Sequence, residues 1–297
     1  MVTSEILISG IVGGVLTGGL YGLLAISFIL IYKSSGVLNF AQGEMAMVGA
    51  YIIFFTLAQL HVPVVLGLVL GIVLAGLFGW VLHETALRPL IGQPVFSMMM
   101  ITVAFSLFFR GITPVIWGTA ILPAPELVPL TTLSIGTVRF SLVGLVSFGC
   151  ACLAATGFTI FFKFTRRGLL MRTVCEDHQL AEATGISVRR ILDQVWILSA
   201  IVAMVGGVLV SQTTGVGDTA ANLALKALPV ALLVGLESIP GALLGGVIIG
   251  VSEILASLYL DAFTCGGMME TFPYIVMLLV LIIRPYGLFG LKRIERV

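Results

Sequence analysis

Long apolar segments divided by short polar breaks run through this chain of 297 residues. A helix needs about 20 mostly apolar residues to cross the hydrocarbon core of a bilayer. Two of the breaks, at Ser34–Gly36 and Glu237–Gly241, are either loops or unwound points inside a membrane. We therefore predict an all-α integral membrane protein, a polytopic bundle of about eight or nine transmembrane helices with at least one of them broken. The candidate segments are Ile6–Tyr32, Asn39–Leu60, Val64–Leu82, Val95–Trp117, Phe140–Phe162, Ile191–Ser211, Ala220–Leu236, Gly241–Leu260 and Thr271–Ile283.

The composition excludes several other classes of protein. Charged residues make up 10% of the chain, against about a quarter in a soluble domain, so we expect one transmembrane domain over residues 1–297. The charges are too few and scattered for a nucleic-acid-binding face. The four cysteines and three histidines lack metal-ligand spacing, so no metal site is expected. The sequence contains no phosphate-binding loop for ATP.

Basic residues predict the orientation of the helices. If the polar stretch Lys163–Arg190 is cytoplasmic, alternation puts the N-terminus outside and the tail Leu291–Val297 inside. The outer loop Gly118–Arg139 is then short and stiff. The basic residues on the cytoplasmic side are Lys33, Arg88, Lys163, Arg166, Arg167, Arg172, Arg189, Arg190, Arg284, Lys292, Arg293 and Arg296.

The stretch Lys163–Arg190 is the longest polar passage in the chain. Between its basic clusters we predict one short helix, Cys175–Gly185, closed by Gly185 in the left-handed conformation. Such an element is either a solvated connector or a docking element for a cytosolic partner, and its order favours docking. The residues expected to make that contact are Cys175, Glu176, Asp177, Ala181, Glu182, Ala183 and Gly185.

Polar side chains gather in the broken segment Ser34–Glu44. Polar groups at membrane depth are expensive and usually face a cavity or a partner, and transporters use unwound backbone beside a helix start to contact solutes. The alternative is a cytoplasmic turn in which Asn39 caps the next helix. The residues predicted to line a pathway here are Ser35, Asn39, Phe40, Gln42 and Glu44.

A second polar group lies around Lys226, Glu237 and Ser238. Lys226 and Glu237 are about three turns apart on a helix, so they are able to share a face, and Pro229 removes one intrahelical hydrogen bond between them. The alternative for Lys226 is snorkelling to the outer interface. We expect Arg110 to snorkel in the same way.

Glycines recur at every fourth position in three of the predicted helices. Such stripes allow helix backbones to approach closely in a membrane, so we interpret them as packing surfaces. They are Gly10, Gly14, Gly18 and Gly22; Gly67, Gly71, Ala75 and Gly79; and Ala242, Gly246 and Gly250.

Four stretches of the chain resemble one known family. They are GLYGLLAISFILIYKSSGVLNFAQGEMAMVGAY, CEDHQLAEATGISVRR, LKALPVALLVGLESIPGALLGGVIIGVSE and RPYGLFG. They are similar to the membrane subunits of branched-chain amino-acid-type ABC importers. Gln42 stands where such permeases often have His, and Glu237 stands where Gly is common.

The resemblance implies a permease subunit in a bacterial inner membrane, with amino acids as the leading solutes. Its implied partners are a homologous second permease, two cytoplasmic ATPase subunits that bind ATP and Mg, an extracytoplasmic solute-binding protein and membrane lipid. No cofactor is implied in this chain. The segment from Cys175 to Gly185 becomes a coupling loop to the ATPases.

Two other classes of function remain open. A stand-alone secondary transporter or channel, for urea, amides or small carboxylates, would need membrane-embedded carboxylates, for which Glu44, Glu237 and Glu253 are candidates. A membrane enzyme would need a converging set of His, Asp or metal ligands, which the sequence does not suggest. Copurification of ATPase subunits separates both classes from an importer subunit.

Overall fold

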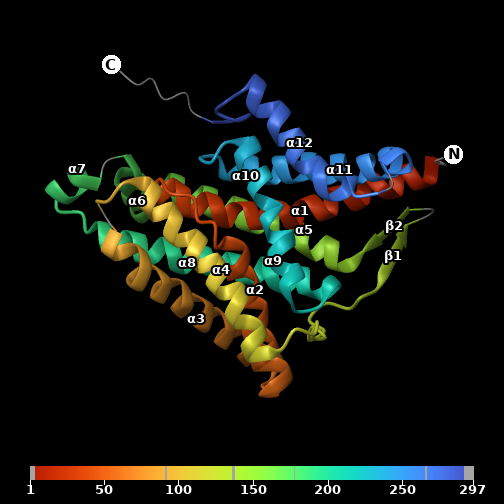
Figure 1. Ribbon diagram of the computed structural model, residues 1–297, viewed down its shortest axis with the longest axis horizontal. Helices are drawn as coiled ribbons and strands as arrows, with labels where there is room; N and C mark the ends of the chain where they lie inside the picture. The colour runs from red at the N-terminus through yellow and green to blue at the C-terminus, as the bar shows by residue number, and fades with distance from the viewer. Residues whose placement is uncertain (1–3, 91, 136–137, 177, 265, 291–297) are drawn as a thin grey trace.

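The computed structural model describes residues 4–90, 92–135, 138–176, 178–264 and 266–290. Six of its helices are long and apolar enough to cross a membrane: Glu5–Ser35, Val64–Leu90, Val95–Trp117, Leu142–Phe164, Val188–Thr214 and Ile239–Thr264. In Figure 1 the N-terminus and the strands lie at one end of the bundle, and α6 and α7 lie at the other. The helices are α1 (Ser4–Ser35), α2 (Gln42–Phe54), α3 (Val64–Leu82), α4 (Val95–Trp117), α5 (Leu142–Phe164), α6 (Arg166–Glu176), α7 (His178–Ala183), α8 (Val188–Thr214), α9 (Asp218–Leu225), α10 (Ala227–Val234), α11 (Ile239–Thr264) and α12 (Met268–Ile283).

Two of the three small-residue stripes, those of α1 and α11, face each other and form the seam between these helices, which lie side by side in Figure 1. A Cβ atom at Gly18 would collide with the backbone of Gly246, and one at Gly14 would lie 2.9 Å from the carbonyl oxygen of Gly250. The prediction that these glycines serve packing is therefore confirmed. Helix α1 contacts α5, α8 and α11, and its residues 21–31 are all buried.

The fold is not purely helical. Strands β1 (Thr132–Ile135) and β2 (Val138–Ser141) form an antiparallel hairpin just before α5. Their alternating polar and apolar residues suit a half-exposed strand pair, with Leu133 opposite Phe140. This hairpin occupies the end of the stretch predicted as a stiff loop, so the all-α prediction needs this correction.

Two helices continue beyond their α-helical part. The second predicted segment begins as α2 and ends in a π-helical turn, Phe55–Gln59. Helix α3 continues through a π-helical turn, His83–Leu87, and a 3₁₀ turn, Arg88–Leu90.

The seventh predicted segment is two short helices, α9 and α10, which meet at Lys226. Pro229 lies in the first turn of α10, where the backbone N–H has no intrahelical partner in any case, so its expected loss of a hydrogen bond is wrong. Helix α10 ends at Gly235, whose φ is 91°. A Cβ there would lie 2.8 Å from Gly290, so both the conformation and the space require glycine.

The polar stretch 163–190 holds more helix than predicted. Cys175 and Glu176 end α6, which already begins at Arg166, so the single helix Cys175–Gly185 is wrong in its boundaries. Its predicted end is confirmed: Gly185 has φ 83°, and Ile186 N–H donates to the Ala181 carbonyl at 3.0 Å, a Schellman-type closure. Asp177 lies outside the described residues.

Candidate functional site

The chain between α1 and α2 returns into the bundle without helical structure. Asn39 is only 2% exposed, and its Oδ1 accepts the Ala41 N–H at 3.0 Å. The Phe40 N–H donates to Thr102 Oγ1 on α4 at 3.1 Å. The N-cap position of α2 is Ala41 and carries no side-chain cap, so the alternative of a surface turn capped by Asn39 does not describe this segment.

A chain of buried hydrogen bonds begins at Asn39. Its Nδ2 donates to Gln42 Oε1 at 2.8 Å, Gln42 Nε2 donates to Ser199 Oγ at 3.0 Å, and Ser199 Oγ donates to the Ser27 carbonyl at 2.8 Å. Gln42 is 1% exposed. This network joins α2 to α8 and α1 and holds the broken segment at a fixed depth, because buried polar groups must find partners.

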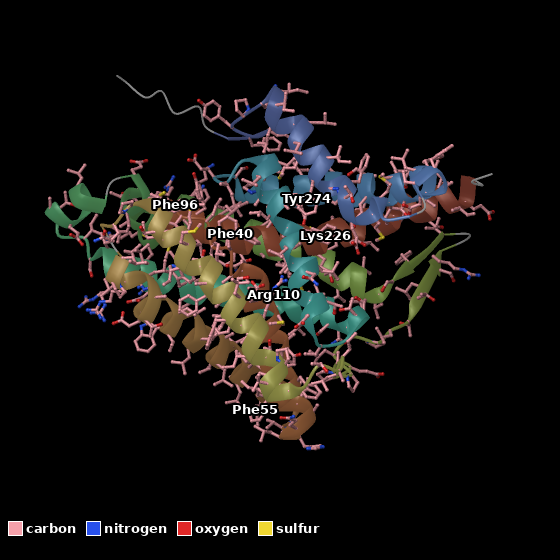
Figure 2. The ribbon with its side chains drawn as sticks, viewed as in Figure 1. Phe40, Phe55, Phe96, Arg110, Lys226 and Tyr274 are labelled. Carbon is pink, nitrogen blue, oxygen red and sulfur yellow. The ribbon has the colours of Figure 1, made fainter. Side chains whose placement is uncertain are left out.

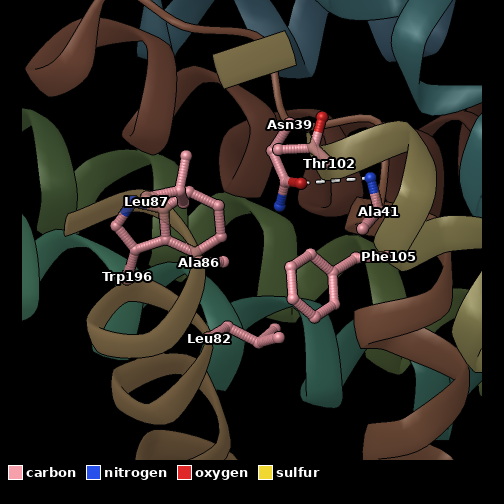
Figure 3. Close-up of a pocket in the computed structure, with 8 residues that line it drawn as sticks. All are labelled: Asn39, Ala41, Leu82, Ala86, Leu87, Thr102, Phe105 and Trp196. Atoms are coloured by element: carbon pink, nitrogen blue, oxygen red, sulfur yellow. Dashed lines mark hydrogen bonds between the residues drawn. The ribbon is translucent and has the colours of Figure 1, made fainter. Parts of the chain in front are cut away.

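Asn39 also lines a small pocket, shown in Figure 3. Trp196 of α8 and Phe105 of α4 face it, and Thr102 adds a hydroxyl. A neighbouring pocket shares Leu87 and Trp196 with it and reaches Ser35, Val37, His83, Gly92, Met98 and Leu192. The two pockets together follow the broken segment.

Glu44 lies in the first turn of α2, and its side chain is fully buried. Its Oε1 accepts from Arg110 Nε at 2.7 Å, and Arg110 Nη2 donates to Asn222 Oδ1 on α9 at 3.1 Å. The Arg110 side chain is 38% exposed. Arg110 therefore forms an ion pair across helices, and the expectation that it snorkels at a helix end is wrong.

Lys226 pairs with Glu253 of α11, not with Glu237. Its Nζ lies 2.5 Å from Glu253 Oε1 and 3.3 Å from the Met269 carbonyl, with side-chain exposures of 11% and 1% for Lys226 and Glu253. The break at Gly235 separates Lys226 from Glu237, so they do not share a helix face. Snorkelling of Lys226 is likewise not observed.

The other predicted pathway residues have local roles. Ser35 Oγ donates to the Ile31 carbonyl, and Ser238 Oγ accepts the Gly241 N–H. The Glu237 carbonyl accepts from Lys33 Nζ at 2.5 Å, which ties the end of α1 to the start of α11. The Glu237 and Phe40 side chains are half-buried.

The stretch 163–190 presents part of the predicted contact set. Glu176, Glu182, Ala183 and Gly185 are exposed, whereas Ala181 is fully buried and Cys175 is half-buried. Ala181 therefore packs inside its own chain. The same stretch exposes two large apolar side chains that sequence reasoning did not single out, Leu169 at 56% and Leu180 at 61%.

Three potential metal ligands converge at His83, Glu84 and Asp193, whose donor atoms lie within 4.8 Å of one another. His83 Nδ1 lies 2.7 Å from Asp193 Oδ1, and Glu84 pairs with both Arg88 and Arg189. Two guanidinium groups at one carboxylate disfavour a bound cation, so the cluster is better described as an ion-pair network between α3 and α8.

Comparison with known proteins agrees with the apolar helical fold, because the matches are membrane permeases. Residues 10–283 match the family described as the permease component of branched-chain amino acid transport systems. The chain belongs to this permease family. Among its curated relatives are the LivH permeases of high-affinity branched-chain amino acid transport in Escherichia coli K12, 30% identical over 96% of both chains, and the BraD permease of Pseudomonas aeruginosa, 28% identical over 97% of both. A probable LivH permease of Methanocaldococcus jannaschii is 31% identical over 96% of this chain and 93% of its own.

Family membership makes the chain a multi-pass membrane permease and assigns no catalytic role to it. Sequence reasoning located the polar segments of this permease, but it did not predict that Arg110 pairs with Glu44 or that Lys226 pairs with Glu253. The available signal was that Glu44 and Arg110 both lie in otherwise apolar segments, where an unpaired charge is expensive.

Proposed function

We propose that this chain is the permease subunit of a binding-protein-dependent ABC importer that takes up branched-chain amino acids. The observation that carries the proposal is the family match over residues 10–283, together with permeases of that named transport at about the same length. The chain would form half of the pathway, with a homologous second permease forming the other half.

The proposed topology has nine membrane passes, with the N-terminus outside and the C-terminus inside a bacterial inner membrane. Two contacts support one common cytoplasmic end: the Lys33–Glu237 hydrogen bond, and Cys175 Sγ at 3.6 Å from the Tyr32 carbonyl. The basic stretch 163–190 lies at that end, which satisfies the positive-inside rule. The passes are α1, α2 with its π turn, α3, α4, α5, α8, α9 with α10, α11 and α12.

The stretch 163–190 is the proposed coupling element to two ATPase subunits, which would bind ATP and Mg; this chain would hold no cofactor. This stretch exposes both apolar side chains, Leu169 and Leu180, and the charged Glu182, a mixture that protein interfaces commonly use. Helix α6 packs on α5, α1 and α8, so a push on it reaches the core of the bundle.

In the proposed cycle, ATP-driven closure of the ATPases displaces α6 and α7 and opens the pathway towards the hairpin end. A docked solute-binding protein then releases solute against the face that contains Phe40, Arg110 and Asn222. Hydrolysis resets the bundle, and the pockets along Ser35 and Asn39 provide the way towards the cytoplasm.

The test is uptake into proteoliposomes that contain this chain with its partner subunits. We expect ATP-dependent uptake of leucine, isoleucine and valine from their binding protein, and no uptake of urea. A hydrolysis-deficient ATPase partner is the control. Uptake that persists without ATPase subunits would instead favour a stand-alone transporter.

A further inference from the structure

Arg110 is a partly exposed cation within the apolar helix α4, in the middle part of the structure in Figure 2. It lies about two turns, or 10 Å, from the end of α4 at Trp117, and 38% of its side chain is exposed. A guanidinium that faces hydrocarbon is expensive, whereas α3 exposes only apolar side chains along its length, such as Val65 at 75% and Val73 at 60%. We therefore expect Arg110 and the exposed Asn222 to meet water, solute or protein, in contrast to the apolar side chains that α4 also exposes, such as Leu107 at 67%.

Glu44 holds the guanidinium without saturating it. Only Arg110 Nε bonds to the carboxylate, and Glu44 Oε2 has no hydrogen-bond partner among the described residues. The Nη2 donor bonds to the neutral amide oxygen of Asn222, and no bond from Nη1 to a described residue is present. The fork of two Nη groups thus has one uncharged acceptor and one position without a hydrogen bond to a described residue.

A carboxylate is the natural ligand of such a fork. It accepts two parallel hydrogen bonds from guanidinium and carries the opposite charge, so it offers both more geometric specificity and more energy than the single bond to the uncharged amide of Asn222 that one of them would replace. A neutral solute such as urea would gain no such advantage. Glu44 would keep Arg110 Nε occupied and so aim the fork outward, as a positioning residue.

We propose that Arg110 is a solute-contacting residue that receives the carboxylate of the transported solute as it leaves the binding protein. This inference rests on the proposed function and deepens it, because it gives the permease its own selection for carboxylate-bearing solutes.

The first arm of the test measures ligand binding without the binding protein. The thermal unfolding of the purified complex is followed with each of three ligands at millimolar concentration. Leucine carries a carboxylate and an amine, 4-methylpentanoate carries the carboxylate alone, and 3-methylbutylamine carries the amine alone. We expect the two carboxylates to raise the melting temperature and the amine to have no effect. In the double variant E44Q/R110M, which removes both charges, this response should disappear. The control variant R139M, which replaces an exposed arginine on the hairpin, should keep it. Should the double variant fail to fold, R110K keeps a charge beside Glu44 and should need about tenfold more carboxylate, the loss expected for a weakened charged hydrogen bond.

The second arm measures leucine uptake per ATP hydrolysed in proteoliposomes. We expect E44Q/R110M to fall at least about tenfold below R139M, with hydrolysis still stimulated by loaded binding protein. A carboxylate response that survives in E44Q/R110M, a wild-type complex that responds to no carboxylate, or unchanged uptake in the double variant would overturn the inference. If the wild-type complex takes up no branched-chain amino acid but binds carboxylates through Arg110, the proposed function fails and the inference stands.

Discussion

Glu44 and Glu253 are two buried carboxylates that each accept a bond from a cation on a neighbouring helix, yet their cations differ in exposure. Arg110 leaves 38% of its side chain exposed beside Glu44, and Lys226 leaves 11% beside Glu253. We call Glu44–Arg110 the open pair and Lys226–Glu253 the closed pair. Both lie next to a break in a transmembrane segment, the start of α2 and the junction of α9 with α10.

The difference in exposure between the two cations indicates two uses of an ion pair in this fold, one structural and one for recognition. A closed pair in a low-dielectric interior adds little net stability, but losing one partner leaves a buried charge without compensation. Arrangements in which the kinked α9–α10 segment moves away from α11 are therefore disfavoured, because they would leave both charges without partners. An open pair keeps donors available to the surroundings, so the same chemistry becomes usable for recognition.

The largest expected effect is on the closed pair. E253Q leaves Lys226 charged and buried, which should destabilise the permease by about 3–5 kcal/mol. Thermal unfolding in detergent measures this, with R139M as the surface control. The apolar double variant K226M/E253M should recover most of the loss; if E253Q unfolds like R139M, the closed pair does not hold the kink.

The second prediction compares the two breaks at their glycines. G235A should cost about 1–3 kcal/mol for a sparsely populated backbone conformation, since φ is 91° and ψ is 128°, plus about 1–3 kcal/mol for overpacking against Gly290. Gly36 also has a positive φ, 69°, but a Cβ there meets no atom within 4 Å, so G36A should show only the backbone cost. Equal losses of stability in the two variants would mean that the crowding around Gly235 is relieved by a small shift.

Sequence reasoning predicted the helical membrane fold, the use of the glycine stripes for packing and the positions of the two breaks, because apolar runs and spacing carry those signals locally. It did not predict that Arg110 bonds to Glu44 or that Lys226 bonds to Glu253, because these partners lie 66 and 27 residues apart and their pairing depends on how the helices pack. The His83–Asp193 contact was missed for the same reason.

The third prediction concerns the carboxylate of the open pair. E44Q removes a buried acceptor charge but leaves Arg110 partly exposed to solvent, so we expect a stability loss of about 1–3 kcal/mol, the range for a lost charged hydrogen bond and smaller than that of E253Q. The same thermal scans as for E253Q provide the measurement. A loss as large as that of E253Q would show that Arg110 is buried in the assembled complex and that the pair is not open.

The fourth prediction concerns A183R, which should leave the stability of the permease unchanged. It separates a defect in coupling to the ATPases from a defect in the solute pathway. Ala183 is exposed on α7, so A183R should fold normally while the added charge weakens the contact with the ATPase subunit. We expect less copurified ATPase and no solute-stimulated hydrolysis, in contrast to E44Q/R110M, which should still hydrolyse ATP. If A183R shows full solute-stimulated ATP hydrolysis, residues 163–190 are a solvated connector and not the coupling element.

The central claim, that the face at Arg110 meets the aqueous pathway and the face of α3 meets lipid, is tested most directly by cysteine accessibility. Single cysteines replace Asn222, beside the guanidinium, and Val73, which is 60% exposed on α3, after the native cysteines are removed. A charged, water-soluble thiol reagent is then applied to the assembled importer in membranes. The account predicts labelling at 222, slowed by leucine, and none at 73 until detergent is added. Labelling at 73 with protection at 222 would contradict it.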